Sequence, residues 1–481
     1  YNSLLGSSED VHSEALSLIE DNAGEKELAA YFAIRKVKHP AECVKNLMNL
    51  RQHIRTFRTV QERRIMREVI PQMLEGALSS EVPDRSIAGL EKLFSAYHIK
   101  SLHLTAFQEQ KDLMLGILKI FSLSPYLTHI FLSNQLYLDT LIEEWSILKT
   151  LTDIKARVER AINRAKNIGQ FLAEFRRMEE IRLGMLYLQG ILQTNDLYRG
   201  ISHLADAIIG AITERLVSKD LAIIALGKLG GREMNFGSDL DIIFVSASEE
   251  AMSAAERILT TLTSYTESGI LYEVDTRLRP DGARGILVND IEGFRNYYLN
   301  SAQNWEIQAL LRARPVAGDH KLTLSFIEMA KTVVQERGDS VKQEDISSMR
   351  KRIVEELSME SKGIDIKLGP GGIEEIEFFI QYLQLQHARA HPDILVQNMH
   401  SAFHRLEKSR LLDKEDAETL RYAYKYFRKI ETILRLNALS FIADDSDIPD
   451  ILAKVMGMKD RAAIMEKLLQ LRKNVLAITN R

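Results

Sequence analysis

The sequence predicts a mostly α-helical protein with a small α/β core, built on a mixed sheet, inserted near its middle and flanked by helical bundles. Apolar residues recur at helical spacing almost throughout residues 1–215 and again after residue 319. Only 9 prolines and 25 glycines occur among the 481 residues, so long uninterrupted helices are allowed. Between residues 221 and 279, short apolar runs beside glycines are instead typical of buried strands.

The length and composition indicate a globular protein of several domains. Hydrophobic residues make up 45% and charged residues 27%, which excludes global disorder. At roughly 100–200 residues per domain, the length predicts two to four domains. We expect a helical linker or regulatory region over residues 1–120, a central domain over 121–320 and a C-terminal helical bundle over 321–481.

Charge and cysteine content narrow the class of partner and the compartment. The net charge of −4 gives no global basic field, so nucleic acid is not an expected partner. No apolar run approaches the ~20 residues that a membrane span needs. The single cysteine, Cys43, excludes a disulfide within the chain and is expected to be a small apolar helix residue in a reducing, cytoplasmic compartment. Because the sequence begins with Tyr1 and shows no leader, we expect a piece of a longer protein.

The helical parts can be placed from prolines and apolar stripes. Prolines in the first part are expected at helix starts or turns: Pro40, Pro71, Pro83 and Pro125. An apolar stripe in the last part has the spacing of a helix face that packs into a core: Leu420, Tyr424, Phe427, Ile430 and Leu434.

The central segment predicts alternating strands and turns. Residues Leu221–Leu226 are expected to form a buried strand that leads into the glycine turn Gly227–Gly231. Asp239–Val245 is the second expected strand, and a helix follows over Ser253–Glu267. A third strand is expected over Ile270–Arg279, stopped by the turn tripeptide Pro280-Asp281-Gly282.

Two carboxylates stand at the start of the second expected strand. Residues two apart on a strand point to the same side, so Asp239 and Asp241 project together, while Leu240 faces a core. Two neighbouring carboxylates repel each other, and a divalent cation relieves that repulsion. Hard oxygen ligands favour Mg²⁺ or Mn²⁺.

The third expected strand supplies further charges on one face. Asp275 alternates with apolar residues and is expected to complete the metal site, while Arg277 and Arg279 hold phosphates with their planar guanidinium groups. The glycine turn lets the backbone approach a phosphate, and Lys228 adds a positive charge. Three carboxylates fit a two-metal, in-line displacement at phosphorus. A lone Asp-x-Asp is more often a solvated strand edge or turn, but the glycine turn and the charged strand together favour a catalytic site.

Four ordered motifs resemble the bacterial glutamine synthetase adenylyltransferase family, within the nucleotidyltransferase superfamily of DNA polymerase β. The resemblance extends from about residue 30 to the end of the chain. The motifs are Ala225–Glu233 continuing to Gly237–Asp241, Val274–Pro280, Trp305–Asp319 and Gly369–Phe378.

The resemblance implies a bifunctional parent with two homologous halves joined by a helical linker. One half transfers AMP from ATP to a tyrosine of glutamine synthetase, and the other removes it by phosphorolysis, giving ADP. A PII signal protein and glutamine control the balance. Residues Ser124–Leu127 and the segment Gly269–Asp275 resemble the linker and the C-terminal, adenylylating half. Glu375 departs from that half, which usually has Asp at this position.

Carried over residue by residue, the resemblance makes residues 121–320 the nucleotidyltransferase domain. It implies that Asp239, Asp241 and Asp275 bind metal. Gly237 and Ser238 would then contact the ATP triphosphate. Glu377, on a helix that begins after the glycines at 369–372, would face the nucleotide. The attraction between an acidic side chain and the positive N-terminal end of a helix explains a glutamate at this position almost as well. Three alternatives stay open: the phosphorolytic deadenylylating half, another nucleotidyltransferase, and a non-catalytic helical regulatory module.

Overall fold

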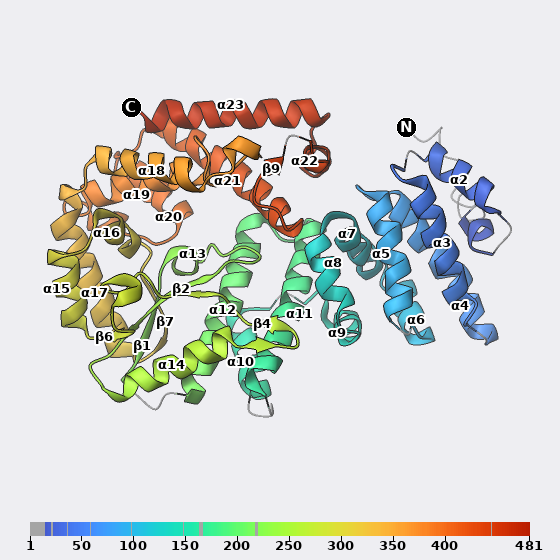
Figure 1. Cartoon of the computed structure of the whole chain (residues 1–481), viewed down its shortest axis with the longest axis horizontal. Helices are drawn as coiled ribbons and strands as arrows, with labels where there is room; N and C mark the ends of the chain where they lie inside the picture. The colour runs from blue at the N-terminus through green and yellow to red at the C-terminus, as the bar shows by residue number, and fades with distance from the viewer. Residues whose placement is uncertain are drawn as a thin grey trace.

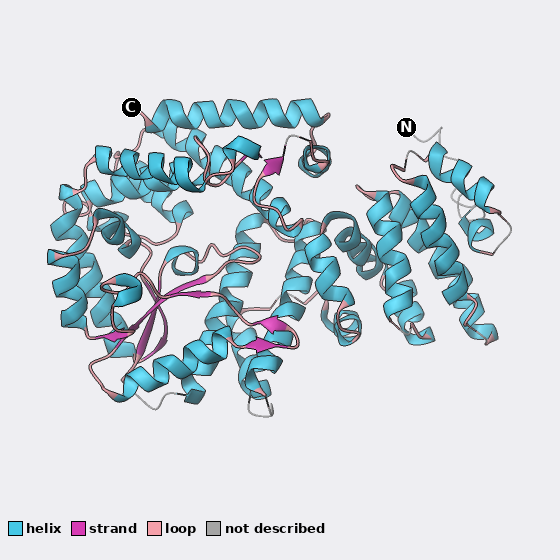
Figure 2. Cartoon of the chain, in the orientation of Figure 1, coloured by secondary structure: helices cyan, strands magenta, loops and turns pink. Residues whose placement is uncertain are grey.

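The computed structural model describes residues 15–481 except 21–22, 36, 58, 98, 148, 163–166, 217–219 and 444. Helices dominate the chain and surround a five-stranded mixed sheet, beside which β3–β4 and β8–β9 form two-stranded sheets (Figures 1 and 2), so the predicted fold class is confirmed. Residues 1–14 of the expected region 1–120 lie outside the described residues. The three domain boundaries stay predictions.

The first part of the chain is a series of helices that extends to one side of the sheet (Figure 1). These helices are α2 (Glu25–Ile34), α3 (Pro40–Ile54), α4 (Val60–Leu78), α5 (Pro83–Ala96), α6 (Ser101–Glu109), α7 (Lys111–Leu123), α8 (Pro125–Leu132) and α9 (Leu136–Glu144). Pro40, Pro83 and Pro125 begin helices, as expected. The prediction for Pro71 is wrong, because it lies inside α4 and is buried there with its apolar neighbours.

The central part combines helices with short strands. Its helices are α10 (Leu151–Ile162), α11 (Ile168–Leu188), α12 (Thr194–Leu216), α13 (Gly227–Gly230), α14 (Glu250–Thr263), α15 (Ile291–Asn300) and α16 (Asn304–Leu310), with the 3₁₀ turn η1 (Gly282–Arg284). Its strands are β1 (Ala222–Ala225), β2 (Leu240–Val245), β3 (Tyr265–Thr266), β4 (Gly269–Ile270), β5 (Val274–Asp275), β6 (Val288–Asn289) and β7 (Arg314–Gly318).

The main sheet has the order β5-β2-β1-β7, and β6 also pairs with β2. Strand β1 is antiparallel to both β2 and β7, whereas β5 and β6 run parallel to β2. Strand β5 pairs with the start of β2 and β6 with its end. The first two expected strands are therefore confirmed. The expected third strand is wrong, since only Gly269–Ile270 and Val274–Asp275 pair, and they belong to different sheets.

The two faces of the sheet contribute to two different cores. Leu240, Ile242 and Phe244 belong to the larger core, which includes buried side chains of α12 and α14. Ile243 and Val245 belong to a second core, with buried side chains of α15, α16 and α17 (His320–Arg337). This alternation confirms the expected sidedness of β2 and places the aspartates on the face of the second core.

The last part of the chain is again helical, and most of its helices, coloured orange to red, lie above the strands in Figure 1. Its elements are η2 (Gly338–Ser340), α18 (Gln343–Leu357), η3 (Glu360–Lys362), β8 (Gly363–Ile364), α19 (Ile373–His387), η4 (Pro392–Ile394), α20 (Met399–Lys408), α21 (Lys414–Leu436), β9 (Ile442–Ala443), α22 (Ile448–Met456) and α23 (Arg461–Thr479). The stripe on α21 packs into the core as expected, apart from half-buried Tyr424.

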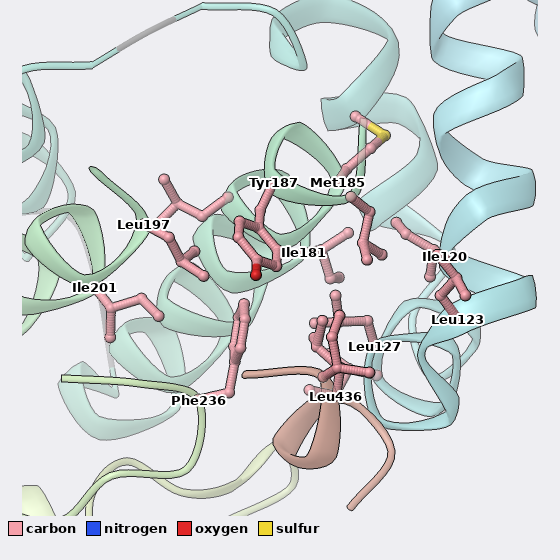
Figure 3. Close-up of a cluster of buried hydrophobic side chains, with 14 of the residues drawn as sticks. Ile120, Leu123, Leu127, Ile181, Met185, Tyr187, Leu197, Ile201, Phe236 and Leu436 are labelled. Carbon is pink, nitrogen blue, oxygen red and sulfur yellow. The ribbon is translucent and has the colours of Figure 1, made fainter. Parts of the chain in front are cut away.

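A cluster of buried side chains joins the three parts of the chain (Figure 3). Leu127 of α8 and Phe236, which lies just before β2, both approach Gly184 of α11. A Cβ added at Gly184 would overlap the Leu127 side chain and lie 3.3 Å from the Phe236 ring, so Leu127 would have to shift to admit a larger residue here. Leu436 at the end of α21 completes the cluster. These contacts therefore hold the loop before β2 in place.

Among the described helices, no single one is long and apolar enough to span a membrane. Helices α7 and α8 pass that test only when they are taken together, and they are bent by 120° at the break between them. Their longest apolar side chains, including Ile117, Phe121 and Phe131, are buried in the core.

Candidate active site

The site begins at the turn between β1 and α13. Gly227 has φ +51°, and a Cβ at this position would overlap Oδ2 of Asp241. The backbone N–H of Leu226 donates to the Asp241 carbonyl at 2.8 Å. The turn is thereby fixed against β2, and its glycine leaves room for the Asp241 carboxylate.

The loop that leads into β2 carries the next predicted residues. Gly237 has φ +63° with no atom near its would-be Cβ, so this turn faces open space. Ser238 Oγ accepts the backbone N–H of Asn235 at 3.0 Å, and the Asn235 amide reaches Thr432 Oγ1 on α21 at 3.3 Å. Asp239 follows and is exposed. A cleft of about 500 Å³ opens beside Gly237 and Ser238, with Tyr126 of α8 and Arg177 of α11 in its wall.

Strand β5 brings Asp275 to the other two aspartates. Asp241 and Asp275 are register partners in the parallel pair β2–β5, and Leu240 N–H donates to the Glu273 carbonyl at 2.9 Å. Side chains of paired residues on parallel strands lie on the same face, so both carboxylates share one side of the sheet. The register thus brings Asp241 and Asp275 together, while Asp239 lies two residues before Asp241, in the loop that precedes β2.

The electrostatics show an incompletely neutralised carboxylate cluster. Burial, followed by the charges on Asp239 and Asp275, raises the pKa of Asp241 to about 7, and Lys367 and Arg277 only partly offset this. Such a donor set, hard oxygens with unbalanced negative charge, fits a divalent cation. Within the described residues, however, no group of three or more His, Cys, Asp or Glu side chains is placed so that it could hold a metal ion.

Arg277 binds the carboxylate of Asp275. Its Nε donates to both Asp275 oxygens at 3.0 and 2.9 Å, and its Nη2 lies 2.5 Å from Asp275 Oδ2. Hydrogen bonding from Arg277 lowers the pKa of Asp275 despite partial burial. Arg277 is itself exposed, so it can release this carboxylate at low cost.

Arg279 is held differently. Its guanidinium donates to Thr276 O and Oγ1 at 2.8 and 2.6 Å, and to the Gly285 carbonyl at 3.2 Å. These bonds close the loop after β5, in which Asp281 and Gly282 form the expected turn with φ values of +59° and +58°. The structure therefore places Arg279 as a clamp within its own loop.

Lys228 and Glu377 form an ion pair across 149 positions of sequence. Glu377 Oε1 also accepts the Tyr424 hydroxyl at 2.7 Å, and Glu377 Oε2 lies 3.8 Å from Arg312 Nη2. Burial opposes ionisation of Glu377, yet Lys228 and Arg312 hold its pKa at about 2. The two residues predicted to meet the nucleotide separately are therefore partners, with the Lys228 charge balanced by Glu377.

Sequence reasoning missed the network behind the glycine turn. Glu233 Oε2 accepts Arg312 Nη1 at 2.7 Å, and Glu233 Oε1 accepts the Met399 backbone N–H at 2.7 Å. Arg314 of β7 binds both oxygens of Asp206 on α12, at 2.7 and 3.0 Å. The buried arginines of the Trp305–Asp319 motif thus hold elements together. Their only signal in the sequence was the presence of charged residues in an otherwise apolar motif.

Comparison with known proteins finds two matching family models and a group of similar enzymes. Residues 115–329 match the family model described as glutamate-ammonia ligase adenylyltransferase, and residues 347–481 match that of PII-uridylyltransferase. Bifunctional glutamine synthetase adenylyltransferase/adenylyl-removing enzymes are similar to the chain over most of its length. That of Rhodopseudomonas palustris (strain HaA2) is 27% identical over 87% of this chain and 46% of the relative. That of Aromatoleum aromaticum is 30% identical over 78% of this chain and 43% of the relative.

The chain spans a little under half the length of these curated relatives. The matched family segment contains all three aspartates and the glycine turn. The chain is therefore a homologue of the bifunctional glutamine synthetase adenylyltransferases/adenylyl-removing enzymes, and its residues 115–329 carry the domain of the glutamate-ammonia ligase adenylyltransferase family.

Proposed function

We propose that the chain transfers AMP from ATP to a tyrosine hydroxyl of glutamine synthetase. The observation that carries this proposal is the register of Asp241 against Asp275, with Asp239 two residues before Asp241 and the Gly227 turn against it. The names of the relatives support both the nucleotidyl transfer and the protein substrate.

The reaction is an in-line displacement at phosphorus. The tyrosine oxygen forms a bond to the α-phosphorus of ATP, the bond from that phosphorus to the pyrophosphate oxygen breaks, and the hydroxyl proton is released. Asp239, Asp241 and Asp275 would hold Mg²⁺ or Mn²⁺, as one or two ions. Bound there, the metal would neutralise charge on the leaving pyrophosphate and lower the pKa of the attacking hydroxyl.

The chain's own residues position the reactants. The backbone N–H groups of the turn at Gly227, together with Gly237 and Ser238, would contact the triphosphate. Arg277, once it leaves Asp275, and Lys228 supply positive charge, and Glu377 orients Lys228. Arg279 shapes the loop that presents Arg277. The cleft beside Gly237 and Ser238 would admit the acceptor tyrosine.

We extend the proposal to regulation and location. A PII signal protein and glutamine would control this activity. The chain would act in the cytoplasm, where its single cysteine, the buried Cys43, stays reduced.

A transfer assay with matched variants tests the proposal. The purified chain is mixed with glutamine synthetase, Mg²⁺ and ATP labelled at the α-phosphate, and a second tube holds AMP-modified synthetase with orthophosphate. We expect label on the synthetase, reduced about 100-fold or more by Asp239→Asn, which removes a metal ligand. Asp112→Asn, the same change at an exposed position on α7, should leave the rate unchanged.

The second tube tests the opposite reaction. In phosphorolysis a phosphate oxygen attacks the same phosphorus, the bond to the tyrosine oxygen breaks, and ADP leaves. ADP formed only with orthophosphate would overturn the assignment of direction and identify the deadenylylating activity. No product in either tube would favour the non-catalytic regulatory module, and transfer of a different nucleotide would identify another nucleotidyltransferase.

A further inference from the structure

A second cavity, of about 460 Å³, lies at the far end of α13 from Asp241. None of the three aspartates lines this cavity. Its walls come from the start of α12, the turn after α13, β7, the start of α20 and the middle of α21. This volume lies within the range of pockets that bind small molecules.

The lining of this cavity is strongly basic. A single carboxylate, that of Glu233, faces six Arg and Lys side chains, namely Arg199, Arg232, Arg314, Arg421, Lys425 and Arg428. Glu233 is already paired with Arg312. Carboxylates behind the wall pair with four of these cations: Asp196 with Arg199, Asp206 with Arg314, Glu407 with Arg421 and Glu431 with Arg428. The excess positive charge therefore lies on Arg232 and Lys425.

Nearby acidic residues leave part of that charge unbalanced. Arg314 takes both oxygens of Asp206, whereas Arg232 reaches the same carboxylate only at 3.9 Å. Burial and the neighbouring Arg314 lower the pKa of Arg232, as crowded cations do. Lys425 is exposed and has no ion pair with any described residue. An anion placed between Arg232 and Lys425 would offset this charge.

One buried donor in the wall also lacks an acceptor. The Arg428 side chain is 4% exposed, and its Nη1 and Nη2 bind Glu431 and the Glu233 carbonyl at 2.6 and 2.7 Å. Its Nε has no hydrogen-bond partner among the described residues. Buried N–H groups are normally satisfied, so a missing acceptor is indicated here. Phe403 and Tyr424 add aromatic surface beside it.

We propose that this cavity binds a small organic anion that carries a carboxylate or phosphate group beside an apolar body. The anionic oxygens would lie on Arg232 and Lys425, and the apolar body against Phe403 and Tyr424. Cationic and neutral ligands are disfavoured because the wall already holds excess positive charge.

A ligand in the cavity can affect Lys228, in the turn after β1, through the carboxylate of Glu377. The Tyr424 hydroxyl donates to Glu377 Oε1 at 2.7 Å, and the same oxygen pairs with Lys228. A ligand that displaces Tyr424 would therefore alter how firmly Glu377 holds Lys228. This regulatory consequence rests on the proposed function, whereas ligand binding itself does not.

Calorimetric titration of the whole chain tests the binding site independently of activity. The probes are phenyl phosphate and benzylsuccinate, with uncharged benzyl alcohol as control, in metal-free buffer to suppress phosphate binding at the aspartates. We expect Kd to rise about tenfold in Lys425→Ala and in Arg232→Ala, because each removes one charge-assisted contact. Lys414→Ala, an exposed lysine at the start of the same α21, should leave Kd unchanged.

The outcomes separate the ligand sources. Binding of phenyl phosphate alone or of benzylsuccinate alone supports the proposal and names the anionic group. The proposal is overturned if neither probe binds, if benzyl alcohol binds as tightly, or if both pocket variants keep the Kd of the unmodified chain. Because Lys425 is exposed, its variant should melt at the same temperature as the unmodified chain.

Discussion

The carboxylate of Asp241 lies directly against the backbone of Gly227, so that a Cβ at residue 227 would overlap Oδ2 of Asp241. The two residues belong to different segments, the turn after β1 and the second position of β2. The turn that we propose to contact phosphate and the carboxylate that we propose to bind metal are thereby held in one fixed relationship.

Gly227→Ala should therefore push Asp241 away from Asp275. We expect AMP transfer to fall about 100-fold, since displacement of a reacting group by ~1 Å has this effect. The positive φ of +51° adds strain for alanine. Gly210→Ala is the matched control, because this α12 glycine has no atom within 4 Å of its would-be Cβ. It should keep full activity and gain about 0.5–1 kcal/mol of stability.

Magnesium should stabilise the folded chain through the aspartates. Repulsion among them contributes to the pKa of about 7 at Asp241, and a cation removes that repulsion. We expect Mg²⁺ to raise the melting temperature at pH 8, and to do so less as protons occupy Asp241 below pH 7. The increase should vanish in Asp239→Asn and persist in Asp112→Asn. An equal increase in all three proteins would argue against a metal site here.

The partly buried Lys228 and the buried Glu377 should behave as one coupled pair. Lys228→Met leaves Glu377 with fewer cations and should cost ~3 kcal/mol of unfolding free energy. Glu377→Gln leaves Lys228 without its carboxylate partner and should lower the free energy of unfolding in the same way. The double variant should cost clearly less than the two single variants added together, as measured by denaturant unfolding. Additive losses would show that the ion pair makes no net contribution.

The side chain of Phe236 should anchor the loop that carries Gly237 and Asp239. It is 1% exposed and lies in the cluster of Figure 3, so Phe236→Ala should lower the free energy of unfolding by about 3–5 kcal/mol. Phe236→Leu should cost much less, because most of the volume is kept. Leu469→Ala, at a side chain that is 52% exposed, should shift the melting temperature little. Equal melting temperatures for all three would contradict this role.

Cys43 should be chemically inert in the native chain. Burial, with the neighbouring Asp84 and Glu42 carboxylates, raises the pKa of its thiol to about 12, so almost no reactive thiolate exists at pH 8. Iodoacetamide should label Cys43 only after denaturation, as read by mass spectrometry. Rapid labelling of the native protein would show that the N-terminal helices open around α3.

The sequence carried enough information for the centre of the site but not for its surroundings. The alternation along β2 correctly placed Leu240 and Asp241 on opposite faces, because successive side chains of any β-strand point to opposite sides of the sheet. The prediction of a continuous strand over Ile270–Arg279 was wrong. In the structure Arg277 folds back on Asp275 and Arg279 closes a loop, and alternation along the sequence indicated neither contact.

Contacts between distant segments had no local signal. The pairing of Lys228 with Glu377 joins residues 149 positions apart, and no periodicity in either segment indicates it. Tyr424 illustrates a related limit. Its position in an apolar stripe predicted core packing, yet its hydroxyl donates to Glu377. An amphipathic side chain can satisfy both patterns, and only the folded arrangement shows which polar atom it meets.

The two parallel partners of β2 have a consequence for how this protein family can vary. The chain leaves the edge of β2 at Asp275 and rejoins the same edge at Val288, so residues 276–287 form an excursion pinned at both ends. Closing a somewhat longer excursion costs little, because loop entropy grows only slowly with length. This segment can therefore change in length at little cost in stability, while Asp241 and Asp275 stay paired in register.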